Sequence, residues 1–200
     1  MIAEATTLLL GQLNNYITQI DGSAGAPTPA VLGNVAQLDR AEVATELDNH
    51  VVLTLVNLEE ERALKNGRVT STLSDGGVGY MNRPFHLNLF LLFTANYRNY
   101  GTALRRLAQV LMFFQGKQQF TFANSPGSNP PQNGIVDFSV TMDLLSLSFE
   151  EVNHLWGFLG AKQGPSAIFR GRLVVVSDQR LLDTSASIQD LDVVGRSVLA

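Results

Sequence analysis

The strongest constraint on the fold is a helix whose two ends can both be read from the sequence, followed by an apolar strand. Ser148 and Glu151 have the spacing of a capping box, in which the serine oxygen and the glutamate carboxylate accept each other's backbone amides. Gly160 is the residue type that most readily adopts the left-handed conformation that ends a helix. One apolar stripe lies between these ends: Val152, Leu155, Trp156 and Leu159. The sequence therefore predicts a helix over residues 148 to 159 that turns its stripe, with the single tryptophan, into a core.

Composition indicates one sizeable domain. The chain has 200 residues, of which 45% are hydrophobic, enough for one core and short for two. After Val176 the sequence turns polar, so we expect a domain over residues 1–176 and a C-terminal extension over 177–200. The net charge of −4 gives no general attraction to nucleic acid or to anionic membranes, and we expect neither as a partner. Without cysteine there is no disulfide and no thiolate metal site.

The remaining periodicity predicts an α+β fold. Residues 2 to 20 are predicted to form an amphipathic helix, and residues 50 to 58 and 85 to 94 are predicted strands that are apolar on both faces, which is typical of central strands. Shorter strands are expected over residues 31 to 38, 118 to 122, 136 to 144 and 166 to 176, and a long hairpin or loop over residues 63 to 84. A further helix over residues 100 to 116 is predicted to bury Tyr100, Ala103, Leu104, Leu107, Leu111 and Phe114. The prediction is a single α+β domain with a mixed, mostly antiparallel sheet and helices packed on it.

No arrangement of residues in the sequence indicates catalysis, a cofactor or a metal. The histidines His50, His86 and His154 are scattered and lack the spacing of a metal site. The glycine-rich residues 75 to 79 lack the Gly-Lys-Ser/Thr ending of a phosphate-binding loop, and Ser166 lacks a nucleophile-elbow context. We therefore predict no catalytic, cofactor-binding or metal-binding residues.

Two charged features are candidates for an interface. Glu59, Glu60, Glu61 and Arg62 follow a strand and form either a solvated end or a contact with a partner. Arg170 and Arg172 share one face of the last strand, which is either an ordinary exposed sheet face or a contact with an acidic neighbour.

The chain resembles the tail-terminator (cap) proteins of extracellular contractile injection systems, which are phage-tail-like particles of bacteria. The resemblance is carried by residues 144 to 160, by Pro165 and Ser166 before a basic strand, and by residues 52 to 62 and 87 to 93. The N-terminal helix and Phe113-Phe114-Gln115 before a proline-rich loop extend it over most of the chain. It implies a non-enzymatic protein that caps the tube and sheath as a homohexameric ring, after assembly in the bacterial cytoplasm, in a particle that can be released.

Three interpretations of different classes follow. The first is this assembly protein, with itself, sheath and tube as partners. Its sheath contact would be made by an edge strand or by residues 177 to 200, pairing with a sheath strand. The second is a non-enzymatic adaptor or binding module on the same scaffold. The third is a hydrolase whose site is assembled from distant residues such as His86 and Glu61.

Overall fold

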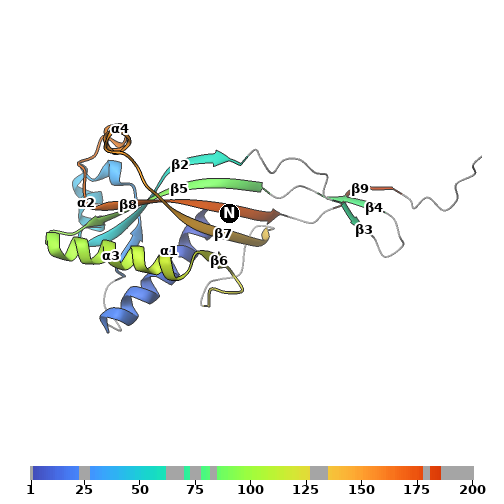
Figure 1. Cartoon of the computed structure of the whole chain (residues 1–200), viewed down its shortest axis with the longest axis horizontal. Coiled ribbons are helices and arrows are strands. Elements are labelled where there is room, and N and C mark those ends of the chain that lie inside the picture. The colour runs from blue at the N-terminus through green and yellow to red at the C-terminus, as the bar shows by residue number, and fades with distance from the viewer. Residues whose placement is uncertain are drawn as a thin grey trace, which may run out of the picture.

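A six-stranded mixed sheet forms the centre of the protein, with helices on both of its faces (Figure 1). The structure is a computed structural model that describes residues 2–22, 28–61, 70–72, 78–81, 85–126, 135–177 and 181–185. The strands follow the order β1-β2-β5-β8-β7-β6, and neighbours are antiparallel except for the parallel pair β1 and β2. They are β1 (Ala30–Leu32), β2 (His50–Glu60), β5 (Phe85–Asn96), β6 (Gln119–Thr121), β7 (Ile135–Leu145) and β8 (Ser166–Ser177). The predicted α+β fold with a mostly antiparallel sheet is confirmed.

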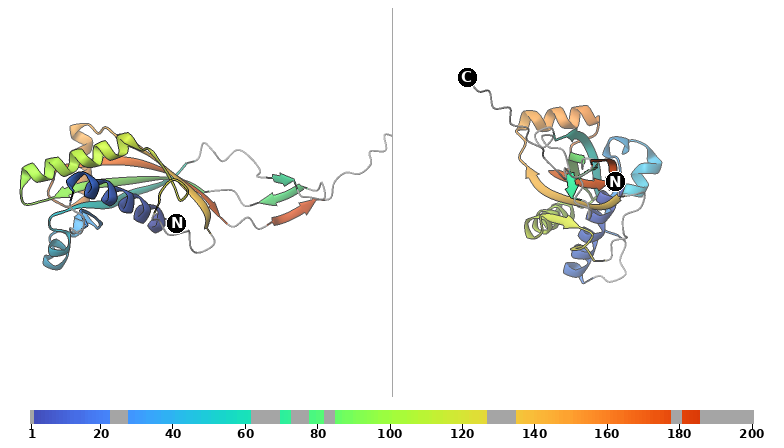
Figure 2. Two further views of the ribbon diagram at one scale, coloured as in Figure 1. Left: turned by 90° about the horizontal axis from the view of Figure 1, so that it is seen from below. Right: turned by 90° about the vertical axis from the view of Figure 1, so that its right-hand side faces the viewer.

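One face of the sheet carries the main hydrophobic core, which α1 (Ile2–Asp21) and α3 (Tyr100–Gly116) cover (Figure 2). Because side chains alternate along a strand, every second residue of β5 enters this core. Leu87, Leu89, Leu91 and Phe93 all do so. The ring of Phe93 meets those of Phe114 and Phe169 at centroid distances of 5.2 and 5.6 Å. This aromatic contact joins α3 to β5, which the sequence predicts to be central, and to β8, which the sequence analysis did not predict to be central.

A polar contact fastens the end of α1 to α3. Gln109 Nε2 donates to Asp21 Oδ1 at 2.9 Å, and Arg106 Nη1 donates to Asp21 Oδ2. Burial raises the pKa of the Asp21 carboxyl, but the hydrogen bonds from Arg106 and Gln109 outweigh burial and hold the pKa below its ordinary value of 3.8. The carboxylate at the end of α1 therefore stays charged in the folded protein.

The ends of α4 (Phe149–Leu159) are those that the sequence predicts. The amide of Glu151 donates to Ser148 Oγ at 3.3 Å, and the amide of Ser148 donates to Glu151 Oε2 at 2.8 Å. These bonds from Ser148 lower the pKa of the Glu151 carboxyl. Gly160 has a φ of 63°, the left-handed conformation, so glycine is required there.

The predicted apolar stripe of α4 packs on the opposite face of the sheet from α1 and α3. Trp156 is 6% exposed and lies in a second core cluster with Val52 and Leu92. Val152, Leu155, Leu159 and Ile168 pack against the same cluster. The predicted packing of α4 on β2 and β5 is confirmed.

The strand predicted over residues 31 to 38 was wrong in its length, and the helix that follows it was not predicted. Only Ala30–Leu32 is a strand, because Asn34 turns the chain and accepts a hydrogen bond from the amide of Ala36, starting a 3-10 helix at Val35–Gln37. The helix α2 (Ala41–Leu47) was not predicted. Its Leu47 reaches Gly33 so closely that a Cβ there would lie 2.6 Å from Leu47 Cδ2, which explains the glycine.

The predicted buried stripe of α3 was also partly wrong. The bounds of the helix are as predicted, but its buried residues are Ala103, Gln109, Val110, Phe113 and Phe114. Tyr100, Leu104 and Leu111, which the sequence analysis placed in the core, are 67%, 45% and 37% exposed. Around the helix, the exposed Tyr100, Leu104 and Leu111 lie next to the buried Ala103 and Phe114, so the sheet covers only part of one wide apolar face.

A small second sheet is formed by β3 (Thr70–Thr72), β4 (Val78–Met81) and β9 (Leu181–Ser185) in the order β3-β4-β9. The strands β3 and β4 are antiparallel, as the hairpin predicted for residues 63 to 84 requires. The strand β9 belongs to the predicted extension of residues 177–200 and pairs with β4. Residues 186–200 lie outside the described part of the chain.

Candidate interaction surfaces

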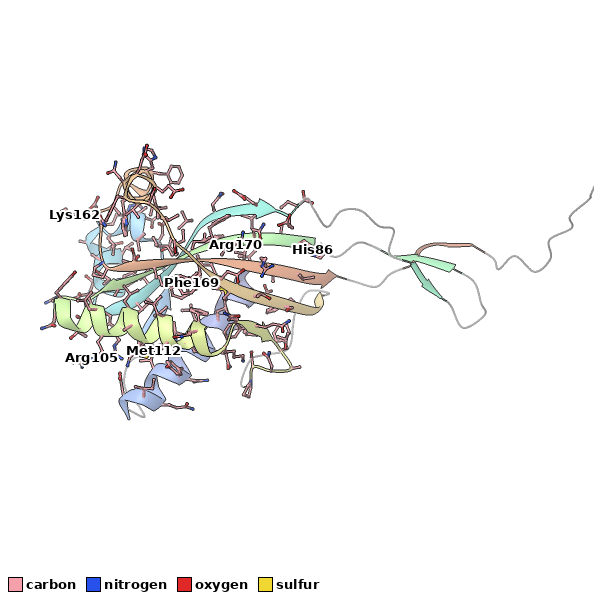
Figure 3. All side chains as sticks on the ribbon, viewed as in Figure 1. His86, Arg105, Met112, Lys162, Phe169 and Arg170 are labelled. Atoms are coloured by element: carbon pink, nitrogen blue, oxygen red, sulfur yellow. The ribbon has the colours of Figure 1, made fainter. Side chains whose placement is uncertain are left out.

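A polar area of the sheet lies beside α4, on the same face. Arg170 and Arg172 come from β8, two residues apart and therefore on one side of the strand, and Asp143 faces them from β7. Arg172 Nη2 lies 3.0 Å from Asp143 Oδ2, and Arg170 Nη2 lies 3.8 Å from the same atom. Figure 3 labels Arg170 on the central strand β8. Two guanidinium groups thus share one carboxylate, which leaves the group with a net positive charge.

Both arginines remain available to a partner. The side chains of Arg170 and Arg172 are 42% and 53% exposed, and ion pairs this open to solvent contribute about 0 to 1 kcal/mol. Arg170 Nε is buried and has no hydrogen-bond partner within the described ranges.

The acidic end of β2 lies near the same polar area. Glu59 and Glu60 are exposed and end the strand, while the amide of Glu61 donates to the carbonyl of His86 at 2.9 Å. Asn88 Nδ2 donates to Glu61 Oε2 at 3.2 Å. Arg62, the fourth residue predicted for this corner, lies outside the described residues.

Glu61 and Arg172 line one cavity of about 180 Å³, together with His86, Asn88 and Thr141. The structure therefore brings together the two charged features that the sequence presents as separate. His86 Nδ1 is buried and lacks a hydrogen-bond partner in the part of the chain that is described. His86 and Glu61, the pair named in the hydrolase interpretation, do meet at this cavity.

The other two histidines, His50 and His154, lie on other elements, β2 and α4. Among the described residues no three His, Cys, Asp or Glu side chains are placed to hold a metal ion.

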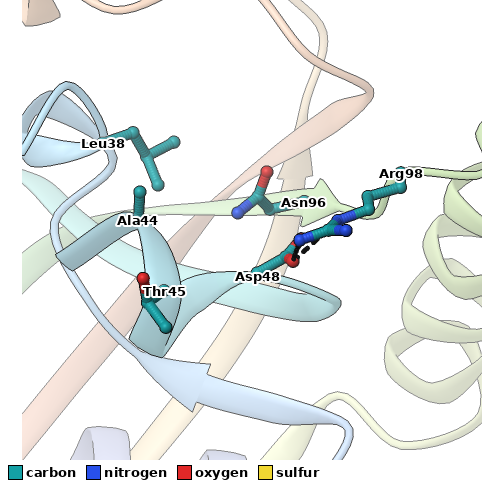
Figure 4. Close-up of a pocket in the computed structure, with 6 residues that line it drawn as sticks. All are labelled: Leu38, Ala44, Thr45, Asp48, Asn96 and Arg98. Atoms are coloured by element: carbon teal, nitrogen blue, oxygen red, sulfur yellow. Dashed lines mark hydrogen bonds and ion pairs between the residues drawn. The ribbon is translucent and has the colours of Figure 1, made fainter. Parts of the chain in front are cut away.

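A second cavity, of about 320 Å³, lies where α2 meets the end of β5 (Figure 4). Arg98 Nε donates to Asp48 Oδ2 at 2.9 Å across it, and Asn96 Nδ2 donates to the carbonyl of Leu47 at 2.8 Å. Leu38, Ala44 and Thr45 complete the lining. These bonds connect α2 to the segment that leads into α3, so the polar groups of this cavity are explained by the fold.

Exposed large apolar side chains lie on several elements, and the sequence analysis did not predict those of α3 and α4 to be exposed. The α3 surface consists of Tyr100, Leu104 and Leu111, with Met112 about 100° further round the helix, whereas the exposed Phe149 and Phe158 lie on opposite sides of α4. Phe149 is 97% exposed and Phe158 is 81% exposed. One feature of the sequence does indicate exposed apolar residues on α3, namely that apolar residues cover a wide arc of this helix. A helix that is buried on a single side needs only a narrower apolar stripe.

The outer edge of β2 is paired over only part of its length. The strand β1 pairs with Val51, Val52 and Leu53, and beyond Leu53 no described strand pairs with this side of β2. A register shift between Leu55 and Asn57 marks a bulge, a feature that discourages uncontrolled pairing at a sheet edge. On this side of β2, residues 55 to 58 thus have no described strand partner.

None of the helices in the described part of the chain is long and apolar enough to cross a membrane.

Comparison with known proteins gives a family match and solved structures of similar fold. The sequence profile described as Pvc16 N-terminal domain matches residues 4–189. A cryo-EM structure of an extracellular contractile injection system, the PVC sheath/tube terminator in the extended state, has a TM-score of 0.55 and 13% identity, covering 99% of this chain and 66% of that one. The anti-feeding prophage cap (AFP tube terminating cap) has a TM-score of 0.56 and 13% identity, covering 94% and 59%. This chain thus spans less than two thirds of their lengths. No curated protein is significantly similar to it.

Proposed function

Because this chain belongs to the Pvc16 N-terminal domain family, we propose that it caps the tube and sheath of a contractile phage-tail-like injection particle and ends tail growth. The family match over residues 4–189 is the observation that carries this proposal. Two solved structures with the same fold are a sheath/tube terminator and a tube-terminating cap, which supports it. The implied setting is assembly in the bacterial cytoplasm into a particle that can be released.

The cap acts as a homohexameric ring, since it has to match the six-fold tube and sheath expected of such particles. Ring closure needs a heterologous contact, in which one patch meets a different patch on the next subunit. The protein offers several exposed groups for this purpose: the polar area of Arg170 and Arg172, the Glu59 to Glu61 corner, the α3 surface and the exposed phenylalanines of α4. Its partners are itself, sheath and tube, with no nucleic acid or membrane.

The role is structural rather than enzymatic. The cavity of Glu61 and His86 is small, about 180 Å³, below the range of about 300 to 1,000 Å³ that is usual for ligand sites. The carboxylate of Glu61 in this cavity is also bound within the protein, because Asn88 Nδ2 donates a hydrogen bond to it. The alternative, a non-enzymatic adaptor on the same scaffold, lacks an observation that favours another partner.

The contact with the sheath lies at the outer edge of β2. An added strand would gain main-chain hydrogen bonds along residues 55 to 58, and the exposed side chains Leu55, Asn57 and Leu58 would set its register. The other place for strand pairing is the extension of residues 177–200, whose β9 already pairs with β4. Truncation of the chain after Ser177 distinguishes a contact through the β2 edge from one through the extension.

Particle assembly without this protein tests the proposal. Particles produced in its absence should have sheaths of irregular length with open ends, and supplying the full chain should restore uniform, closed particles. A chain that ends at Ser177 should restore closure if the β2 edge makes the contact, and should leave ragged ends if the extension makes it. Electron microscopy of particle lengths is the measurement, and uniform closed particles in the complete absence of the protein would refute the capping role.

A further inference from the structure

A row of polar residues crosses the main sheet on the face that α4 partly covers. Residues paired in register lie side by side on neighbouring strands, so the pairing aligns one residue from each of five strands. This polar row consists of Glu59 of β2, Asn88 of β5, Arg172 of β8, Thr141 of β7 and Gln119 of β6. It spans four strand spacings, about 19 Å. The helix α4 packs on the same face over Leu92 and Ile168, so it does not cover the polar row.

The polar row is positive at its centre and negative at one end. Arg172 and Arg170 share the carboxylate of Asp143, with distances of 3.0 and 3.8 Å, which leaves one positive charge over β8. Glu59 is exposed at the β2 end of the row. Only β5 lies between β8 and β2, so these opposite charges are on strands about 9.5 Å apart. A complementary partner therefore carries acidic groups for β8 and, within that distance, a basic group for β2.

The C-terminal sequence of this chain contains such a set of charges. Asp190 and Asp192 are two residues apart, as Arg170 and Arg172 are, and in extended backbone such a pair lies on one side of the strand. Arg196 follows four residues after Asp192, and four extended residues span up to about 13 Å. Residues 186–200 contain no other charged side chain. This segment thus matches the polar row in the sign, order and spacing of its charges.

The segment begins far from the polar row of its own subunit. The strand β4 ends at Met81, shortly before β5 begins, and β9 is antiparallel to β4. Leu181 pairs with Met81 and Ser185 with Val78, so β9 runs away from the main sheet. Figure 2 shows the small sheet apart from the main sheet, with β9 pointing away from it. To reach its own polar row the chain would have to turn back along the whole small sheet, which favours the row of another copy.

We propose that residues 186–200 of one copy lie across the polar row of a second copy, with Asp190 and Asp192 against Arg170 and Arg172, and Arg196 against Glu59. The proposal rests on the proposed function in one respect, since it names a contact within the ring proposed there. Segment and row are different surfaces, so the contact is heterologous, as a ring requires. The order of opposite charges fixes the direction in which the segment lies.

Cysteine cross-linking tests this contact directly, because the chain contains no cysteine of its own. Thr141→Cys places a thiol in the polar row, and Leu191→Cys places one between the two aspartates, so no proposed charge is removed. Co-expression brings the two variants into the same ring, and a short bismaleimide should then join them into a covalent dimer with one copy of each. Either variant alone should give no dimer. Thr7→Cys, an exposed position on α1 at the opposite face, is the control for Thr141→Cys and should give none with Leu191→Cys.

Each outcome has a defined meaning. Rings that form without the mixed dimer would overturn the contact and leave the capping role intact. A chain with both Thr141→Cys and Leu191→Cys that cross-links only within itself would also overturn it, because the segment would then cover its own row. As much dimer with Thr7→Cys as with Thr141→Cys would do the same. Absence of a ring for the unmodified chain, both free and on purified particles, would overturn this contact together with the ring in the proposed function.

Charge reversal provides an independent arm. Asp190→Lys combined with Asp192→Lys should raise the concentration at which rings dissociate by about tenfold, because like charges would then face Arg170 and Arg172. Asp39→Lys combined with Glu46→Lys makes the same change in net charge at exposed positions elsewhere and should change this concentration little. Sedimentation across a dilution series is the measurement, and circular dichroism checks that both variants remain folded. An equal effect of the two pairs would contradict the contact.

Discussion

Asp21 shows how a single residue can hold two elements of this fold together. It is the last residue of α1, where a negative charge opposes the helix dipole, yet Arg106 and Gln109 of α3 bind its carboxylate. Its partner Arg106 lies 85 residues away in sequence. The sequence analysis could not predict this contact, whereas it did predict the capping box of Ser148 and Glu151, because both partners of a capping box lie within one helical turn.

Replacing Asp21 with asparagine should lower the free energy of unfolding by about 1 to 2 kcal/mol at neutral pH, because a hydrogen-bonded charge is lost. The pKa of Asp21 is lowered in the folded protein, so its stabilisation is fully present above the ordinary value of 3.8 and disappears as the pH falls through the lowered folded pKa. The difference between Asp21→Asn and the parent should therefore shrink at strongly acidic pH.

Urea denaturation across this pH range is the measurement. Glu46→Gln, which removes an exposed carboxylate on α2, is the matched control and should change little at any pH. A loss for Asp21→Asn that is equally large at neutral and strongly acidic pH would show that the charge is not what stabilises the contact.

At the scale of elements, long periodic segments were predictable and short or ambiguous ones were not. In the strands β2 and β5 and the helices α1 and α4, the spacing of apolar residues fits only one type of secondary structure. The short α2 has little apolar surface, and only its Leu47 is buried, so its pattern is weak. For α3 the helix was predictable but its buried residues were not, because its apolar residues cover a wide arc of the helix and the sheet buries only part of that arc.

The two aromatic residues of α4 should behave oppositely in a folding experiment. Trp156→Ala removes a large side chain that is 6% exposed and should cost about 3 to 5 kcal/mol of the free energy of unfolding. Phe158→Ala is the control on the same helix, and because Phe158 is 81% exposed it should change the value for the isolated subunit by less than about 0.5 kcal/mol. Thermal melting is sufficient, and a Trp156→Ala protein that melts within a degree or two of the parent would contradict the packing of α4.

At the scale of the whole molecule, the two faces of the sheet differ in what covers them. One face is closed by α1 and α3 over the main core, and the other is covered by α4 at one end and polar at the other. The sequence predicted the fold class and singled out Arg170 and Arg172, but not Asp143 of β7, which pairs with both. It did not predict that Glu61 and Arg172 share a cavity, because their strands are neighbours of β5 on opposite sides, and this order is a property of the sheet. The exposed surfaces of α3 and α4 likewise became visible only once the buried sides were assigned.

The capping role makes the location of the protein on the particle its most direct test. Electron microscopy of intact particles labelled with gold-conjugated antibody against this chain should show label at one end only, over a ring of six-fold symmetry that closes both tube and sheath. Label distributed along the sheath, or particles with closed ends that carry no label, would contradict the account.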